Sequence, residues 1–158
     1  MKLGLLALDV FPFNADEAVV GLMAGHILEG RWPVFFYGQA YMGSMDASLV
    51  AIGFALFGQR VIVIRAVQIL LYLGTVFTTM QLGRRIFRST RVALIAGLLM
   101  AIPAVNVTLY TTVSLGGYGE MLLIGNLLLL LALRIAKRKD ENWPYLVWGF
   151  LAGLGFWA

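Results

Sequence analysis

Residues 61–82 read VIVIRAVQILLYLGTVFTTMQL, an apolar stretch whose only charged residue, Arg65, lies near one end. A helix of this length crosses a hydrocarbon core of about 30 Å with some tilt, and a long side chain near its end can extend to the interface. Further apolar stretches follow at residues 92–113, 118–136 and 143–158, and Pro103 predicts a kink in the first of these. The sequence therefore predicts an all-α, polytopic transmembrane helix bundle.

The composition supports this class. Of the 158 residues, 61% are hydrophobic and 13% are charged, whereas soluble domains carry about 25% charged residues. The chain has no cysteine, which excludes disulfide frameworks, thiolate metal sites and cysteine nucleophiles. Its net charge of +4 is explained by basic residues that set membrane topology, and we expect no nucleic-acid partner.

Basic residues crowd two of the connections between the apolar stretches, and both connections are expected to be cytoplasmic. The first carries Arg84, Arg85, Arg88 and Arg91, and the second carries Arg134, Lys137, Arg138 and Lys139. One topology satisfies both clusters, and it places four acids on the extracytoplasmic face: Asp16, Glu17, Asp46 and Glu120. We expect an integral multi-pass protein of the cell (plasma) membrane.

The chain is expected to be the N-terminal part of one larger transmembrane domain, because its last residues stop inside apolar sequence. Residues 1–13 would then be the remnant of a first span and residues 14–58 an outer loop. Apolar residues recur at helical spacing from Val19 to Ile27, and a second apolar stretch covers residues 47–57. These patterns predict two amphipathic helices that lie along the membrane surface.

The acidic pair Asp16-Glu17 stands at the start of the first of these helices. Asn14 can cap the helix with Glu17 three residues later, as in a capping box, and this alone could explain the pair. Helical geometry also predicts that Asp16 points along the apolar stripe of Val19 and Met23, with Glu17 rotated away by about 100°. A carboxylate that faces a partly dry site can act as a general base. Asp16 and Glu17 are therefore candidate catalytic residues.

Two further acids lie near loop aromatics or glycines on the same face. Glu120 ends the stretch Gly-Gly-Tyr-Gly-Glu at residues 116–120, where glycines allow a tight turn or close approach to a ligand. Asp46 follows the loop tyrosine Tyr41, and assisting the start of the next helix is the alternative role for this acid. The candidate substrate-binding residues are Tyr41, Asp46, Tyr118 and Glu120.

No cofactor motif is present: the sequence contains no phosphate loop, zinc-ligand spacing, serine elbow or dinucleotide fingerprint. No cofactor is therefore required, and no residue is assigned as a metal ligand. A divalent metal could bind the outer carboxylates, but nothing in their spacing demands one. Carboxylates and aromatics at a membrane surface suit a sugar or polyol substrate with a lipid partner.

Several motifs occur in the order seen in GT-C class membrane glycosyltransferases: Asp16-Glu17, Gly30-Arg31-Trp32-Pro33, Tyr41, Leu56-Phe57-Gly58 and Arg65. The chain most resembles glycosyltransferase family 39, the protein O-mannosyltransferases and lipid A aminoarabinose transferases, from Asn14 to about Arg138. Many members follow the loop tyrosine with an acid, a lysine and two prolines, whereas here residues 42–46 read MGSMD, so acceptor specificity does not carry over.

The resemblance implies an inverting hexosyl- or pentosyltransferase. The implied donor is a polyprenyl-phosphate-linked sugar in the bilayer, and the acceptor would be a protein, lipid or glycan. The catalytic acid of the family's first outer loop maps onto Asp16, with Glu17 as its neighbour.

Two other functions use the same acids differently. In a multi-span transporter they would relay protons or cations, and in a non-catalytic membrane subunit they would only cap helices. Transporters usually place ionisable groups within their spans, near the bilayer midplane. The apolar stretches of this chain are nearly free of such groups, which favours the transferase.

Overall fold

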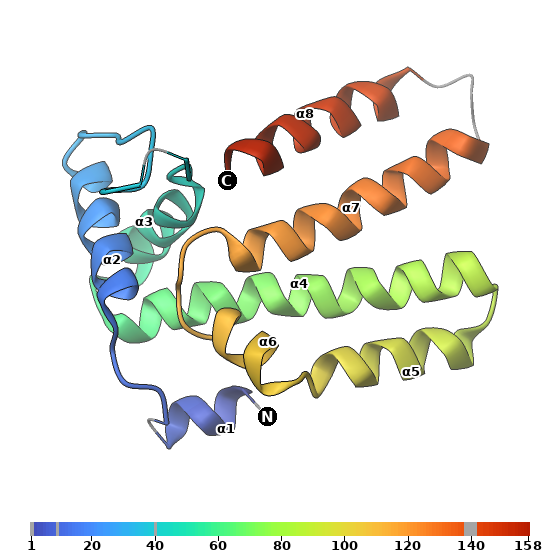
Figure 1. The fold of residues 1–158 in the computed structure, drawn as a ribbon, viewed down its shortest axis with the longest axis horizontal. Coiled ribbons are helices and arrows are strands. Elements are labelled where there is room, and N and C mark those ends of the chain that lie inside the picture. The colour runs from blue at the N-terminus through green and yellow to red at the C-terminus, as the bar shows by residue number, and fades with distance from the viewer. Residues whose placement is uncertain (1, 9, 40, 138–141) are drawn as a thin grey trace.

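The computed structural model describes residues 2–8, 10–39, 41–137 and 142–158 (Figure 1). Within these ranges the chain is helical, and the only β-type pairing is a single bridge between Phe35 and Gly43. The helices are α1 (Lys2–Ala7), α2 (Ala15–Leu28), α3 (Met45–Phe57), α4 (Val61–Phe87), α5 (Thr90–Ala101), α6 (Val105–Tyr110), α7 (Tyr118–Lys137) and α8 (Trp143–Trp157). The all-α class is thus confirmed.

Within the part of the chain that the structure describes, two helices, α4 and α7, are long and apolar enough to cross a membrane by length and composition. Helix α4 continues beyond the predicted end at residue 82, whereas α7 coincides with the predicted stretch 118–136 to within a residue. Helix α8 covers most of the predicted stretch 143–158 but has only 15 residues. Helix α1 is a short helix of 6 residues inside the predicted span remnant.

The predicted span at residues 92–113 is not one continuous helix, which corrects the expectation of a simple kink. Helix α5 ends at Ala101, and α6 begins only at Val105. The break surrounds Pro103, which lacks an N–H group and disfavours the helical conformation of the residue before it. That residue, Ile102, has φ −118° and ψ 68°, outside the helical range.

The longer helices pack side by side, with α4 in contact with α5 and α7, and α7 in contact with α8 (Figure 1). Helices α2 and α3 pack against each other and against the first part of α4. Because α4 and α7 run in the same direction, both end on the right in Figure 1, opposite α2 and α3. The described basic residues at these helix ends and the acids near α2 and α3 therefore occupy opposite ends of the bundle.

Polar side chains join the apolar helices. Asn126 of α7 donates hydrogen bonds to α4: to the Thr75 carbonyl oxygen at 3.2 Å, and to the hydroxyls of Thr78 and Thr79 at 3.1 and 2.9 Å. Interhelical hydrogen bonds of this kind contribute roughly 1 kcal/mol each in membrane proteins. They fix the contact between α4 and α7, which carry residues of the site described below.

The outer segment has a small core of its own. It is formed mainly by buried apolar side chains of α2, α3 and the first turn of α4: Val20, Met23, Ala24, Ile27, Ala47, Val50, Ala51, Phe54, Val63 and Ile64. Gly53 allows α3 to approach α4 closely, since a Cβ there would lie 2.9 Å from the Val63 side chain. The location of α2 and α3 on the membrane surface stays a prediction.

The end of α8 reaches back to the loop between α2 and α3. The indole Nε1 of Trp157 donates a hydrogen bond to the Val34 carbonyl oxygen at 3.1 Å. Gly43 lies directly against Trp157, and any side chain at residue 43 would overlap the Trp157 ring and carbonyl oxygen. Two segments far apart in the sequence thus fix one side of this loop.

Candidate functional site

The two acids at the start of α2 lie in different environments, and Glu17 is the buried one. Asn14 caps the helix by accepting a hydrogen bond from the Glu17 backbone N–H at 2.9 Å, as predicted. The Glu17 side chain is 0% exposed. Its two oxygens accept hydrogen bonds from Nε and one terminal nitrogen of Arg65, each at 3.0 Å. Arg65 also donates to the Phe11 carbonyl oxygen at 3.0 Å.

The prediction that Glu17 points away from the buried stripe is therefore wrong. Glu17 shares the buried face of α2 with Val20, Met23, Ala24 and Ile27. A carboxylate can occupy such a face only when a cation compensates for its lost hydration, and Arg65 of α4 supplies that charge. The ion pair also joins α2 to α4 next to Asp16.

Asp16 lies off this buried face and lines an open cavity of about 360 Å³. The other lining residues come from the loop after α2, the end of α6, the start of α7 and the segment between α6 and α7: Phe36, Gln39, Tyr41, Met42, Tyr110, Leu115 and Tyr118. The rings of Tyr110 and Tyr118 are in contact, with centroids 4.9 Å apart and planes inclined by 57°. An aromatic wall with one carboxylate is a typical composition for a small-molecule site.

The cavity brings together three of the six predicted site residues: Asp16, Tyr41 and Tyr118. Asp46 and Glu120 lie elsewhere, side by side in the protein interior, with 4% and 1% of their surfaces exposed. Asp46 accepts hydrogen bonds from Gln68 Nε2 at 2.6 Å and from the Ser114 hydroxyl. These contacts join α3, α4, α7 and the segment before α7. The role of Asp46 and Glu120 in substrate binding stays a prediction.

The two buried carboxyls need a proton between them. No donor among the described residues reaches either oxygen of Glu120, and its side chain interacts with that of Asp46. Burial raises the pKa of Asp46, the hydrogen bonds from Ser114 and Gln68 oppose that rise, and the charge of Glu17 adds to it. Adjacent carboxylates in a dry site cannot both ionise at low cost, so burial and mutual repulsion favour a protonated carboxyl in this pair.

Sequence reasoning missed Gln68, which is 2% exposed and bonded to Asp46. It follows Arg65 by three residues and so shares a face of α4 with it. The signal in the sequence was a second polar residue, Gln68, at helical spacing from Arg65 in an otherwise apolar stretch. This spacing could have revealed a polar face on α4. Gln68 also explains why residue 119 is a glycine, because a Cβ there would lie 2.8 Å from Gln68 Oε1.

The glycine turn before α7 has the conformation that glycine favours. Gly116 and Gly117 have φ values of +73° and +47°, a region that residues with a side chain rarely adopt. A Cβ on Gly116 would overlap the end of the Met42 side chain, which lines the Asp16 cavity. The turn therefore brings the segment before α7 against the loop that carries Tyr41.

Within the described ranges, no group of three or more His, Cys, Asp or Glu side chains is arranged to hold a metal ion. The carboxylates described above are instead divided between the ion pair of Glu17 with Arg65, the carboxyl pair of Asp46 with Glu120, and the cavity wall, where Asp16 lies.

Comparison with known proteins identifies a family. A family model described as dolichyl-phosphate-mannose-protein mannosyltransferase matches residues 43–158. The matched range contains Asp46, Gln68 and Glu120 and begins after the Asp16-Glu17 pair. No curated protein matches the chain, and neither does any solved structure.

Proposed function

The chain belongs to the dolichyl-phosphate-mannose-protein mannosyltransferase family, and on that premise we propose that it transfers a sugar from a polyprenyl-phosphate donor to an acceptor at the extracytoplasmic face. Membership makes it a membrane glycosyltransferase and weighs against a transporter or a non-catalytic subunit. The acceptor would offer a hydroxyl or phosphate oxygen on a protein, lipid or glycan.

The observation that carries the proposal is the position of Asp16. Its carboxylate lines an open cavity together with Tyr41 and Tyr118, whereas the adjacent Glu17 is held by Arg65. Asp16 is therefore the acid of the pair that is accessible to a substrate. The Glu17–Arg65 ion pair fixes the first turn of α2 and so positions the Asp16 backbone at the cavity.

The chemistry follows from one carboxylate beside two bound substrates. Asp16 accepts the proton of the acceptor hydroxyl as that oxygen attacks the anomeric carbon of the sugar. The bond from this carbon to the phosphate oxygen breaks, and the polyprenyl phosphate leaves with the electron pair, which inverts the anomeric centre. Proximity of donor and acceptor at one membrane face supplies much of the rate, and a general base adds about 10²- to 10⁴-fold.

The test replaces Asp16 by asparagine in the full-length protein. Asp16→Asn keeps the size of the side chain and removes the base, so we expect turnover to fall about 100- to 10,000-fold. The assay supplies a polyprenyl-phosphate sugar and candidate acceptors, and mass spectrometry follows the product. Thermal stability should change little, because asparagine is tolerated at a helix start.

A matched control is Glu29→Gln, which removes an exposed acid from the other end of α2. Its turnover should equal that of the unaltered protein. Near-normal turnover of Asp16→Asn would mean that Asp16 only stabilises the start of the helix and has no catalytic role. Turnover with a nucleotide sugar in the absence of lipid would overturn the proposed donor.

A further inference from the structure

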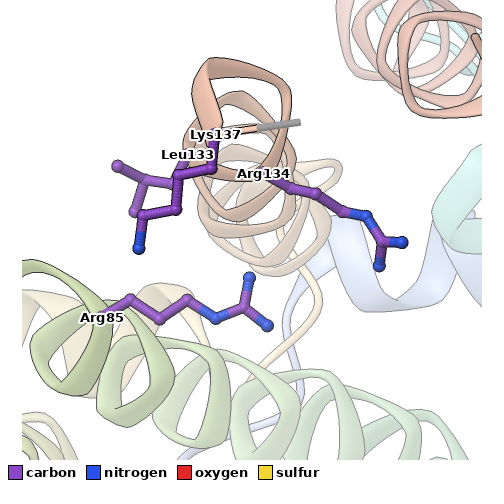
Figure 2. A pocket seen from close by; sticks show the side chains of 4 residues that line it. All are labelled: Arg85, Leu133, Arg134 and Lys137. Atoms are coloured by element: carbon purple, nitrogen blue, oxygen red, sulfur yellow. The ribbon is translucent and has the colours of Figure 1, made fainter. Parts of the chain in front are cut away.

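A cationic cavity lies at the end of the bundle opposite the carboxylates, between the last turns of α4 and α7. Its volume is about 280 Å³, and its lining residues are Arg85, Leu133, Arg134 and Lys137 (Figure 2). Figure 2 shows Arg85 and Lys137 extending into the space between the two helices, with Arg134 on the other side of α7. Among the described residues that line it, three are cationic and none is acidic.

The cavity is placed where a lipid headgroup would lie. Helices α4 and α7 are the two that are long and apolar enough to cross a membrane, and the cavity is formed by their ends. The Arg134 guanidinium lies over the Trp143 ring, 4.6 Å from its centroid. Tryptophan is enriched at membrane interfaces, and its ring face favours a cation. Leu133 adds an apolar wall.

Helix ends and topology explain part of this arrangement. Cations are favoured in the last turn of any helix by its dipole, and basic residues gather on one side of a membrane. Neither effect requires that cations from two different helices converge on one cavity. Convergence of like charges is unfavourable unless an anion lies between them. Basic pockets between membrane helices are known to bind anionic lipid headgroups.

We propose that this cavity binds the phosphate headgroup of an anionic phospholipid. Arg85 and Lys137 would donate hydrogen bonds to the phosphate oxygens, and Leu133 would contact the adjoining acyl chain. This lipid site is separate from the proposed transfer site and does not depend on the proposed function.

The experiment compares two lipids of equal chain length with the full-length protein. The protein is purified in detergent, titrated with phosphatidylglycerol or phosphatidylcholine, and examined by native mass spectrometry. We expect phosphatidylglycerol to bind at least about 10-fold more tightly, because each basic residue near an anionic lipid contributes roughly a further fivefold. Equal affinity for the two lipids would overturn the proposal without the use of any variant.

Two double variants then locate the site. Arg85→Gln with Lys137→Gln removes two cavity cations, and we expect phosphatidylglycerol affinity to fall about 10-fold. Arg88→Gln with Arg91→Gln removes the same charge from the same end of the bundle, outside the cavity lining, and should leave the affinity within about twofold. Equal losses in both variants would show a general charge effect and refute the site.

A third arm distinguishes a lipid from a free anion. Inorganic phosphate at millimolar concentration is added to the complex with phosphatidylglycerol. A lipid site retains the phospholipid, because its acyl chains bind as well as its phosphate. Complete displacement by inorganic phosphate would show a simple anion site and contradict the proposal.

Discussion

Charged side chains are buried at one end of the bundle and exposed at the other. Near α2 and α3, Glu17, Asp46, Arg65 and Glu120 are each at most 5% exposed, and each has a specific polar or charged neighbour. At the other end, four arginines around the connection between α4 and α5 are exposed: Arg84, Arg85, Arg88 and Arg91. Buried charges depend on their partners, whereas exposed ones are screened by water and salt. The cost of a charge substitution in this chain should therefore follow burial rather than sign.

The largest effect on stability is expected for Glu17→Gln. This variant removes the carboxylate that compensates for the buried Arg65, and breaking a buried pair costs about 3–5 kcal/mol. Thermal unfolding of the purified protein in detergent measures the loss. Replacing both partners together, Glu17→Met with Arg65→Met, should recover much of it, because no buried charge is then left uncompensated.

The exposed pair of Glu29 and Arg31 gives the matched comparison. It is also an arginine–glutamate contact, but more than half of each side chain is exposed, with 63% for Arg31 and 61% for Glu29. Glu29→Gln should change the free energy of unfolding far less than Glu17→Gln does, because water and salt screen an exposed pair. If Glu29→Gln lowers stability as much as Glu17→Gln does, burial does not explain the difference between the two ends.

An intermediate effect, visible in pH dependence, is expected for Asp46→Asn. Burial raises the pKa of Asp46 above its ordinary value of 3.8, so the folded protein holds a proton that the unfolded chain releases. The resulting contribution to stability is complete below about pH 3.8 and is lost as pH rises through the folded-state pKa. The unaltered protein should therefore melt at a lower temperature, by a few degrees, as pH rises from about 4 through the folded-state pKa.

The asparagine variant sharpens this test. Its amide can donate to Glu120 and accept from Gln68 or Ser114 without a titrating proton. The slope of melting temperature against pH should become smaller in Asp46→Asn than in the unaltered protein. An unchanged slope would mean that the carboxyl pair holds no shared proton in this pH range.

The smallest effect is expected at the cationic end. Arg84 lies exposed in the last turn of α4, outside the cavity lining. Arg84→Gln should change the free energy of unfolding by less than about 0.5 kcal/mol, as is usual for exposed sites. The same thermal unfolding assay measures this change. A loss of several kcal/mol in the free energy of unfolding would contradict the expected difference between the two ends.

Local pattern was enough to predict the helices but not every boundary. Apolar length alone located α7, because nothing interrupts that stretch before its basic end. Pro103 predicted a disturbance, yet a proline can kink a helix or end it, and neighbouring helices decide which. The result was two helices, with α5 ending at Ala101 and α6 starting at Val105.

The candidate site shows the same limit. Spacing identified the acids, and Asp16, Tyr41 and Tyr118 do line one cavity. It could not decide which of the two adjacent acids faces the interior, because the deciding residue, Arg65, is 48 positions away from Glu17. Gln68 was missed for a similar reason, since its partner Asp46 lies on another helix.

The contact between Trp157 and Val34 has a consequence for the order of folding. The two residues are 123 positions apart, so the loop that carries Tyr41 obtains this anchor only after α8 has been synthesised. Contacts between neighbouring segments form before those that close long loops. We therefore expect α2, α3 and α4 to assemble first, with the cavity wall completed last. During synthesis the cavity lined by Asp16 would thus form only after α2, α3 and α4 are in place.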